Sequence, residues 1–189
     1  MASTVRKPPP EASSPEPRSP DARLHRSSPA ARRRWVSSAA LAIMATLGAA
    51  LPAAAADAMQ ERRWVAQLNQ EERGWVWGVI GKRSAQKLQE EALAHFVNGQ
   101  DRFMTDDHLA WKARAGMRAN AWGHVRDAIA QMSEAQASEP TWIYWRARAM
   151  QALNEPDAAT ATLKARELYD SIASPNGFYE QLALEALGH

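Results

Sequence analysis

The sequence contains no cysteine, which excludes disulfide bonds, thiolate metal ligands, cysteine nucleophiles and a lipid-modified N-terminal cysteine. It also lacks any useful stretch of period-two alternation, so we expect no β-sheet. Neither a phosphate-cradling glycine motif nor a His-Glu-x-x-His or Gly-x-Ser-x-Gly motif occurs. These absences disfavour nucleotide-binding loops, zinc proteases and serine hydrolases.

Groups that could support catalysis or hold a metal are few and scattered. Three histidines stand far apart: His95, His108 and His124. Three carboxylate pairs are adjacent in sequence: Glu71–Glu72, Glu90–Glu91 and Asp106–Asp107. On a helix, adjacent side chains point about 100° apart, whereas a glycosidase needs two carboxyl groups that converge on one bond. We therefore expect no catalytic residue, no metal site and no cofactor.

The basic excess is confined to the N-terminal part of the chain. Eight of the 23 Lys and Arg residues, but only three of the 21 Asp and Glu residues, precede residue 57, which leaves 15 basic and 18 acidic side chains in the remainder. A nucleic-acid-binding protein needs a basic face that neutralises phosphates. We therefore expect no nucleic-acid partner.

The first 56 residues have the composition of an exported protein's leader. Residues 1–34 are rich in proline, serine and arginine, which predicts a disordered extension. An uncharged, alanine-rich run over residues 35–56 follows three arginines and ends in an Ala-x-Ala site at Ala54–Ala56, which predicts a signal peptide and a periplasmic protein. A membrane span and a chance alanine-rich helix are the alternatives. Pro52 and the high alanine content disfavour a stable span.

An aromatic residue recurs every 34 positions in the rest of the chain. The four positions are Trp77, Trp111, Trp145 and Tyr179. Each is followed four positions later by a small residue: Gly81, Ala115, Ala149 and Ala183. One helical turn separates the two, so each ring stands beside a notch that a neighbouring helix can approach closely. We predict that the four aromatic residues are structural and lie between helices.

A period of 34 is that of helix-turn-helix repeats of tetratricopeptide size, in which stacked units bury a shared core. Asn120 and Asn154 suit left-handed residues at helix ends, and Pro156 suits the first turn of a helix. We predict an all-α fold. It comprises a lead-in helix over residues 57–74 and, over residues 75–189, antiparallel repeats in a tetratricopeptide-like right-handed superhelix.

Three phrases resemble a known family. TWIYWRARAMQALN (residues 141–154), followed by a second helix and NGFYEQLALEALG (residues 176–188), resembles the closing repeats of the α-superhelical domain of soluble lytic murein transglycosylases. DDHLAWKARAGMRANAWGHV resembles the preceding repeat. The resemblance runs from about Trp75 to Gly188, and Glu180 stands where relatives often have a small residue.

This resemblance implies a periplasmic array of helices that embraces peptidoglycan glycan strands. In such enzymes a separate lysozyme-like domain cleaves between N-acetylmuramic acid and N-acetylglucosamine, using one glutamate in a Glu-Ser-x-Phe type motif. No Glu-Ser dipeptide occurs in this chain. The sequence therefore indicates a truncated or rearranged relative without glycan-cleaving activity of its own, whose affinity for glycan strands is weak or lost.

Four residues are candidates for contact with a glycan or a protein partner. Trp122 and Trp142 fall outside the 34-residue register, so their rings are available for stacking on sugars. Arg114 and Arg148 lie on the first helices of repeats, where they could meet peptide carboxylates or lactyl groups. Helix packing for the tryptophans and pairing with nearby acidic residues for the arginines are the alternatives.

Three functions follow from these observations. The first is a periplasmic repeat piece of a lytic transglycosylase, associated with peptidoglycan. The second is a tetratricopeptide-like adaptor that binds a protein partner, and the third is an active glycan-cleaving enzyme. The first accounts for the specific phrases, whereas the second accounts only for the period. We also expect the apolar end of the array near Trp75 to promote self-association.

Overall fold

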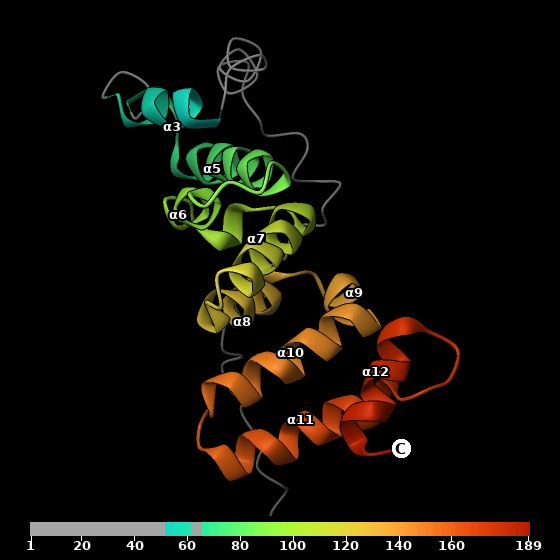
Figure 1. Cartoon of the computed structure of the whole chain (residues 1–189). Helices are drawn as coiled ribbons and strands as arrows, with labels where there is room; N and C mark the ends of the chain where they lie inside the picture. The colour runs from blue at the N-terminus through green and yellow to red at the C-terminus, as the bar shows by residue number, and fades with distance from the viewer. Residues whose placement is uncertain (1–51, 62–65) are drawn as a thin grey trace, which may run out of the picture.

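The computed structural model describes residues 52–61 and 66–189, and every regular element within them is helical (Figure 1). The predicted all-α class is confirmed. The predicted extension over residues 1–34 and most of the predicted signal peptide lie outside the described residues. The elements are α3 (Pro52–Gln60), α5 (Gln70–Gln86), α6 (Ala92–Val97), the 3₁₀ turn η1 (Asp101–Phe103), α7 (Asp106–Arg118), α8 (Trp122–Gln131), α9 (Glu134–Ala137), α10 (Pro140–Leu153), α11 (Ala158–Ile172) and α12 (Phe178–Leu187).

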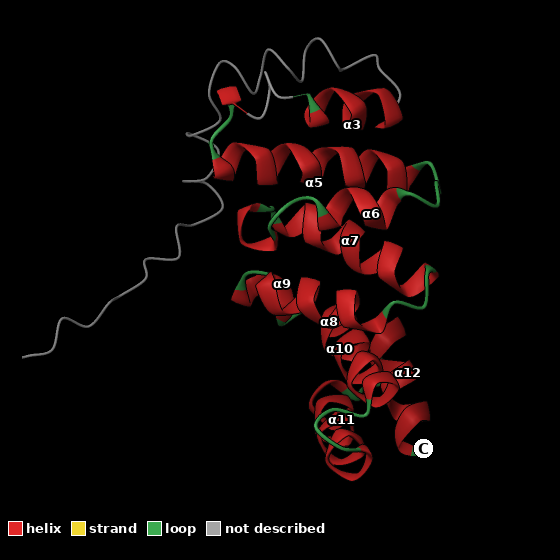
Figure 2. Ribbon diagram, turned by 90° about the vertical axis from the view of Figure 1, so that its left-hand side faces the viewer, coloured by secondary structure: helices red, strands yellow, loops and turns green. Residues whose placement is uncertain are grey.

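Consecutive helices form hairpins that stack on one another. α5 contacts α6, α7 contacts α8, and α10 contacts α11. Between hairpins, α5 contacts α7 and α8 contacts α10, while α12 lies against α11 and α10. The result is an elongated, repeat-like array that runs from α3 to α11 and α12 (Figure 1). The helix axes turn along this array, because α5 lies across the view in Figure 2 whereas α11 is seen nearly end-on.

The first long helix begins earlier than the sequence suggested, at Gln70 instead of Trp75. The Asn69 side chain accepts a hydrogen bond from the Glu72 N–H at 2.9 Å, and the Glu72 carboxylate accepts one from the Asn69 N–H at 3.0 Å. This reciprocal cap fixes the start of α5. α3 ends at Gln60, so the predicted lead-in helix over residues 57–74 does not form as one helix.

The start of α11 also differs from the prediction. Asp157 is the residue that caps this helix, so Pro156 lies before the first turn and not in it. The Asp157 carboxylate accepts hydrogen bonds from the Thr160 N–H at 2.9 Å and from the Thr160 hydroxyl at 2.8 Å. A carboxylate in this position satisfies free N–H groups and opposes the helix dipole. Pro140, at the start of α10, is the proline that occupies a first turn.

The turns of the hairpins repeat with the predicted spacing. Asn120 and Asn154, which are 34 positions apart, have φ values of 54° and 52°. Both therefore adopt the left-handed conformation that the sequence predicted for them. In the first hairpin the left-handed residue is Leu88, with φ of 58°, so this turn falls outside the register of the other two. A leucine tolerates this conformation less well than asparagine does.

The small residues that follow the periodic aromatic residues lie inside the array. All four are buried, as the spacing predicted: Gly81, Ala115, Ala149 and Ala183. A Cβ atom added at Gly81 would lie only 2.7 Å from the ring of Phe96 on α6. Because this distance is shorter than van der Waals contact, the helices of the first hairpin can approach this closely only when residue 81 is glycine.

The periodic aromatic residues line the same interior. Trp77 is buried, whereas Trp111, Trp145 and Tyr179 are half-buried. Trp111 and Trp145 lie against the largest core cluster, which joins α5 to α10. Trp145 Nε1 donates a hydrogen bond to the Tyr179 hydroxyl at 3.4 Å, so two successive repeats touch through equivalent positions.

The apolar end near Trp75, from which the sequence predicted self-association, is covered by α3. α3 lies along the outer side of α5 (Figure 1). Met59 of α3 shares a core cluster with Val76 and Ile80 of α5, and all three are buried. Ala56, at the predicted cleavage site, belongs to the same cluster. The first hairpin therefore uses part of the predicted leader as its cap.

Candidate ligand-contact surface

Six aromatic side chains from four helices gather at the C-terminal half of the array. We call this group the aromatic cluster: Trp122 of α8, Tyr144 and Trp145 of α10, Tyr169 of α11, and Phe178 and Tyr179 of α12. Its ring centroids lie 5.1 to 6.4 Å apart in neighbouring pairs, within the range of favourable aromatic contacts. The cluster thus joins α8, α10, α11 and α12.

Tyr144 lies at the centre of the cluster. Its ring is 5.4 Å from Trp145, 5.5 Å from Tyr169 and 5.6 Å from Tyr179. Tyr169 is fully buried, and its hydroxyl donates a hydrogen bond to Gln151 Oε1 at 2.9 Å. Burial raises the pKa of Tyr169 to about 12, so its hydroxyl stays neutral at physiological pH. This interior part of the cluster is structural.

Trp122 and Trp145 form a partly accessible pair within the cluster. Both are half-buried, and their rings stack with centroids 6.4 Å apart and an interplanar angle of 29°. Trp122 Nε1 donates a hydrogen bond to Asn120 Oδ1 at 2.7 Å, which fixes the orientation of the indole. The left-handed turn at Asn120 therefore positions the sequence-predicted contact residue Trp122. The pair offers a partly exposed aromatic surface at the turn between α7 and α8.

Trp142 is not available for contact with a ligand, which corrects the sequence hypothesis. It is only 2% exposed and belongs to the largest core cluster. The guanidinium carbon of Arg114 lies 5.3 Å from the Trp142 ring and 5.2 Å from the Trp111 ring. Arg114 therefore makes cation–π contacts that cover two tryptophans, although the residue as a whole is exposed.

Arg148 is exposed and lies beside the aromatic cluster. Its positive charge favours the ionised phenol of Tyr169, so it partly offsets the rise in the pKa of Tyr169 that burial causes. Within residues 52–61 and 66–189, no carboxylate lies within ion-pair distance of Arg148. An external carboxylate can therefore reach the Arg148 guanidinium. Arg114 is exposed as well, but its guanidinium lies over two tryptophan rings.

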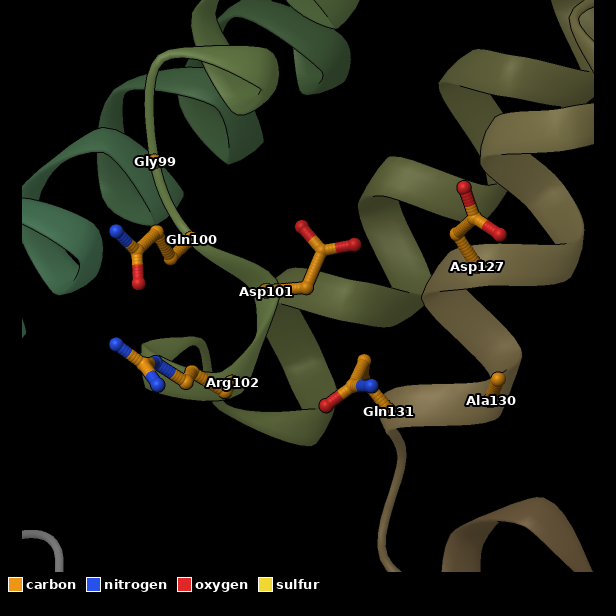
Figure 3. Close-up of a pocket in the computed structure, with 7 residues that line it drawn as sticks. All are labelled: Gly99, Gln100, Asp101, Arg102, Asp127, Ala130 and Gln131. Atoms are coloured by element: carbon orange, nitrogen blue, oxygen red, sulfur yellow. The ribbon is translucent and has the colours of Figure 1, made fainter.

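A polar depression of about 610 Å³ lies between the segment around η1 and α8 (Figure 3). Its lining residues are Gly99, Gln100, Asp101, Arg102, Asp127, Ala130 and Gln131. Lys112 Nζ donates hydrogen bonds to both carboxylate oxygens of Asp101, at 2.7 and 2.6 Å, although Lys112 is only 5% exposed. The Asp127 carboxylate is paired with Arg126 at 2.8 Å. Both carboxylates therefore have cationic partners.

Sequence reasoning did not identify the Lys112–Asp101 ion pair. The available signal was a lysine directly after Trp111, at the second position of the phrase WKARAGMRAN. Its partner lies in η1, outside the repeated phrases. Each of the two carboxylates in this depression is held in an ion pair with a cationic side chain, whereas a glycosidase has two carboxyl groups that converge on one bond.

The adjacent carboxylates Asp106 and Asp107 diverge, as the sequence predicted for a helix start. Asp106 accepts hydrogen bonds from the Ser133 N–H at 2.8 Å and the Ser133 hydroxyl at 2.7 Å, which ties α9 to α7. Asp107 forms an ion pair with Lys82 of α5. In the part of the chain that the structure describes, no group of three or more potential metal ligands occurs.

His108 lies buried at the start of α7, where it contacts α5. The Thr105 hydroxyl accepts a hydrogen bond from the His108 N–H at 3.2 Å, and the Thr105 N–H donates to His108 Nδ1 at 3.5 Å. Desolvation lowers the pKa of His108 to about 4, with Asp107 raising it and Lys82 lowering it to smaller extents. The imidazole is therefore neutral in the folded protein at neutral pH, with Nδ1 as an acceptor.

We predict that acid destabilises the fold through His108. In the unfolded chain this histidine binds a proton near its ordinary pKa of 6.5, whereas in the folded chain it does so only near 4. Stability is therefore fully retained above pH 6.5, and as the pH falls to about 4 roughly 3 kcal/mol of unfolding free energy is lost. Denaturant unfolding at several pH values measures this loss.

His108→Gln provides the control for this prediction. A glutamine side chain can still accept the Thr105 N–H, as in an ordinary capping box, but it does not titrate. The difference in unfolding free energy between the two proteins should therefore change by roughly 3 kcal/mol between neutral pH and pH 4. A difference that stays constant over this range would contradict the assignment.

Within the described segments, no helix is both long enough and apolar enough to cross a bilayer. Compared with known proteins, the sequence matches no protein-family model and no curated protein.

Proposed function

We propose that this protein is a periplasmic, peptidoglycan-associated repeat module without glycan-cleaving activity of its own. It is related to the closing repeats of the α-superhelical domain of soluble lytic murein transglycosylases, and its hairpins form a tetratricopeptide-like right-handed superhelix. Its ligand is the glycan strand of the cell wall, which it contacts through Trp122, Trp145 and Arg148.

The positions of the family-like phrases support this proposal. Each phrase falls on the first helix of a unit: DDHLAWKARAGMRAN on α7, WIYWRARAMQAL on α10 and FYEQLALEAL on α12. The phrases therefore coincide with repeated structural units, and their shared small residues face the interior. A chance likeness in composition would not require the phrases to fall at the same place in each structural repeat.

The observation that carries the proposal is the half-buried Trp122–Trp145 pair beside an exposed arginine. Indole faces stack on the apolar C–H faces of sugar rings. A partly exposed pair of rings contributes more to binding affinity than scattered rings do, because the orientation of the pair is fixed before the ligand binds. Arg148 has no carboxylate partner among the described residues, and a guanidinium binds lactyl and peptide carboxylates in a bidentate manner. The indole pair therefore suits the sugar rings of peptidoglycan, and the arginine suits its lactyl and peptide carboxylates.

Co-sedimentation with purified sacculi tests the proposal. We expect the protein to pellet with sacculi, and Trp122→Ala to weaken binding roughly five- to tenfold, since an aromatic contact contributes about 1 kcal/mol beyond area burial. Arg148→Gln should weaken binding as well. Leu163→Ala is the matched control, because Leu163 is an exposed apolar residue of α11 outside the aromatic cluster.

Two outcomes would overturn the proposal. One is a protein that stays in the supernatant at saturating amounts of sacculi. The other is binding that Trp122→Ala and Leu163→Ala weaken equally, since this would indicate non-specific adhesion. Digestion of muropeptides should yield no 1,6-anhydro product, and the appearance of that product would show instead that the chain is itself a glycan-cleaving enzyme.

A further inference from the structure

The predicted leader cleavage site lies inside a folded helix. The Ala-x-Ala site at Ala54–Ala56 falls in the middle of α3, so a cut after Ala56 would divide this helix. A peptidase that recognises such a site must take the side chain of the last alanine into a pocket for small residues. In the folded protein Ala56 is only 4% exposed, because it packs in the core cluster that α3 forms with α5. The side chain that has to be recognised is therefore hidden while α3 is docked.

The helical backbone of α3 is a second obstacle to cleavage. Peptidases bind the substrate backbone in an extended conformation, in which its N–H and C=O groups are free to pair with the enzyme. In a helix these groups are hydrogen-bonded to one another. The Ala56–Asp57 bond can therefore be cut only after α3 has left α5 and has unwound.

α3 can detach without unfolding the rest of the array. It packs against α5, and the residues that it buries are Pro52, Ala55, Ala56 and Met59. Met59 has the only long side chain of the four, so α3 buries little apolar area compared with the hairpins that follow. Segments of this kind open at a lower free energy than global unfolding requires.

Cleavage would in turn weaken the docking of α3. The cut is a hydrolysis, in which water adds across the Ala56–Asp57 bond and leaves a carboxylate on Ala56 and an ammonium group on Asp57. Only residues 57–60 of α3 then remain attached, and so short a segment does not sustain a helix by itself. Met59 loses the rest of the helix that holds it beside Val76. Docking thus protects the bond, and cutting the bond weakens docking.

We infer that the docking of α3 on α5 makes removal of the leader depend on the folding state of the first hairpin. A peptidase cuts a chain whose first hairpin has not yet closed, or one from which α3 has detached. A chain that folds first keeps both its leader and its cap. The inference rests on the export that the proposed function includes, but it concerns the opposite end of the array from the Trp122–Trp145 pair.

Elastase, which cuts after small side chains, tests this protection in the purified full chain, with mass spectrometry to identify the bonds that are cut. Cleavage after Ala54–Ala56 should be at least roughly tenfold slower in the folded chain than in a chain unfolded with urea. Met59→Gln should accelerate this cut roughly tenfold in the folded protein, because docking would bury an amide without a partner. The bonds after the fully buried Ala147 and Ala165 should stay intact, which shows that the array remains closed.

Val97→Gln is the matched control, because Val97 is 54% exposed on α6 and this change should leave the rate unaltered. Signal peptidase in detergent micelles should also cut Met59→Gln after Ala56 faster than it cuts the natural chain. A folded chain that elastase cuts as fast as the unfolded one, or equal rates for Met59→Gln and Val97→Gln, would overturn the inference. Absence of any cut by signal peptidase in both proteins would overturn it together with the predicted leader, whereas failure to pellet with sacculi bears on the proposed glycan binding alone.

Discussion

Replacing Asp101 with alanine should lower the free energy of unfolding by roughly 3 to 5 kcal/mol. Lys112 lies on α7 with only 6% of its side chain exposed, and Asp101 is its hydrogen-bonded partner through both oxygens. Without the carboxylate, an ammonium group would stay buried and uncompensated in the interior. Denaturant unfolding at neutral pH measures the loss.

The double substitution Asp101→Ala with Lys112→Met separates the energetic contribution of the ion pair from that of side-chain packing. Methionine retains most of the length of lysine without its charge, so the double variant should be far more stable than the single one and within about 1 to 2 kcal/mol of the natural protein. Asp107→Ala breaks the more exposed pair with Lys82 and should cost less than about 1 kcal/mol. Equal costs for Asp101→Ala and Asp107→Ala would show that Lys112 is not buried as described.

Removing α3 should destabilise the array and make it self-associate. A chain that begins at residue 62 lacks the cover over Val76 and Ile80, which are buried against α3 and its neighbours. Loss of the fully buried Met59 alone removes about 1.5 to 3 kcal/mol of apolar burial, and the uncovered face is a new apolar patch. We expect a lower unfolding midpoint and concentration-dependent association in sedimentation velocity.

A chain that begins at Pro52 is the control for this experiment, since it retains α3. It should unfold like the full chain and stay dispersed at the same concentrations. Processing after Ala56, as the leader-like sequence predicts, would leave only the last part of α3 and should produce behaviour between that of the two shortened chains. Identical midpoints for chains that begin at 52 and at 62 would show that α3 does not cap the first hairpin.

The parts of the fold that repeat could be predicted from the sequence. Asparagine at two helix ends located the left-handed turns at Asn120 and Asn154, and spacing located the buried positions Ala115, Ala149 and Ala183. Each depends on local helix geometry that recurs with the period. The aromatic residues of α5 by themselves place its start too late, at Trp75. The Asn69–Glu72 capping box was present in the sequence and marks its true start.

Features that depend on non-equivalent neighbours could not be predicted in this way. Trp142 falls outside the 34-residue register and was therefore a candidate for ligand contact, with helix packing as the alternative. It is buried in the core cluster to which α7 and α8 contribute, and Arg114 of α7 lies over its ring. Whether such a residue is buried depends on its contacts with the adjacent hairpin, and the 34-residue period gives no information about those contacts. Lys112 is another case, because its partner Asp101 lies in a segment outside the repeated phrases.

NMR of the indole N–H groups tests the central claim, that the Trp122–Trp145 pair contacts glycan strands, most directly. Purified soluble peptidoglycan fragments are titrated into the protein, and the tryptophan signals are assigned by single substitutions. We predict that the signals of Trp122 and Trp145 shift in a saturable manner while that of the buried Trp142 does not. Signals of Trp122 and Trp145 that stay in place at saturating fragment concentrations would contradict it.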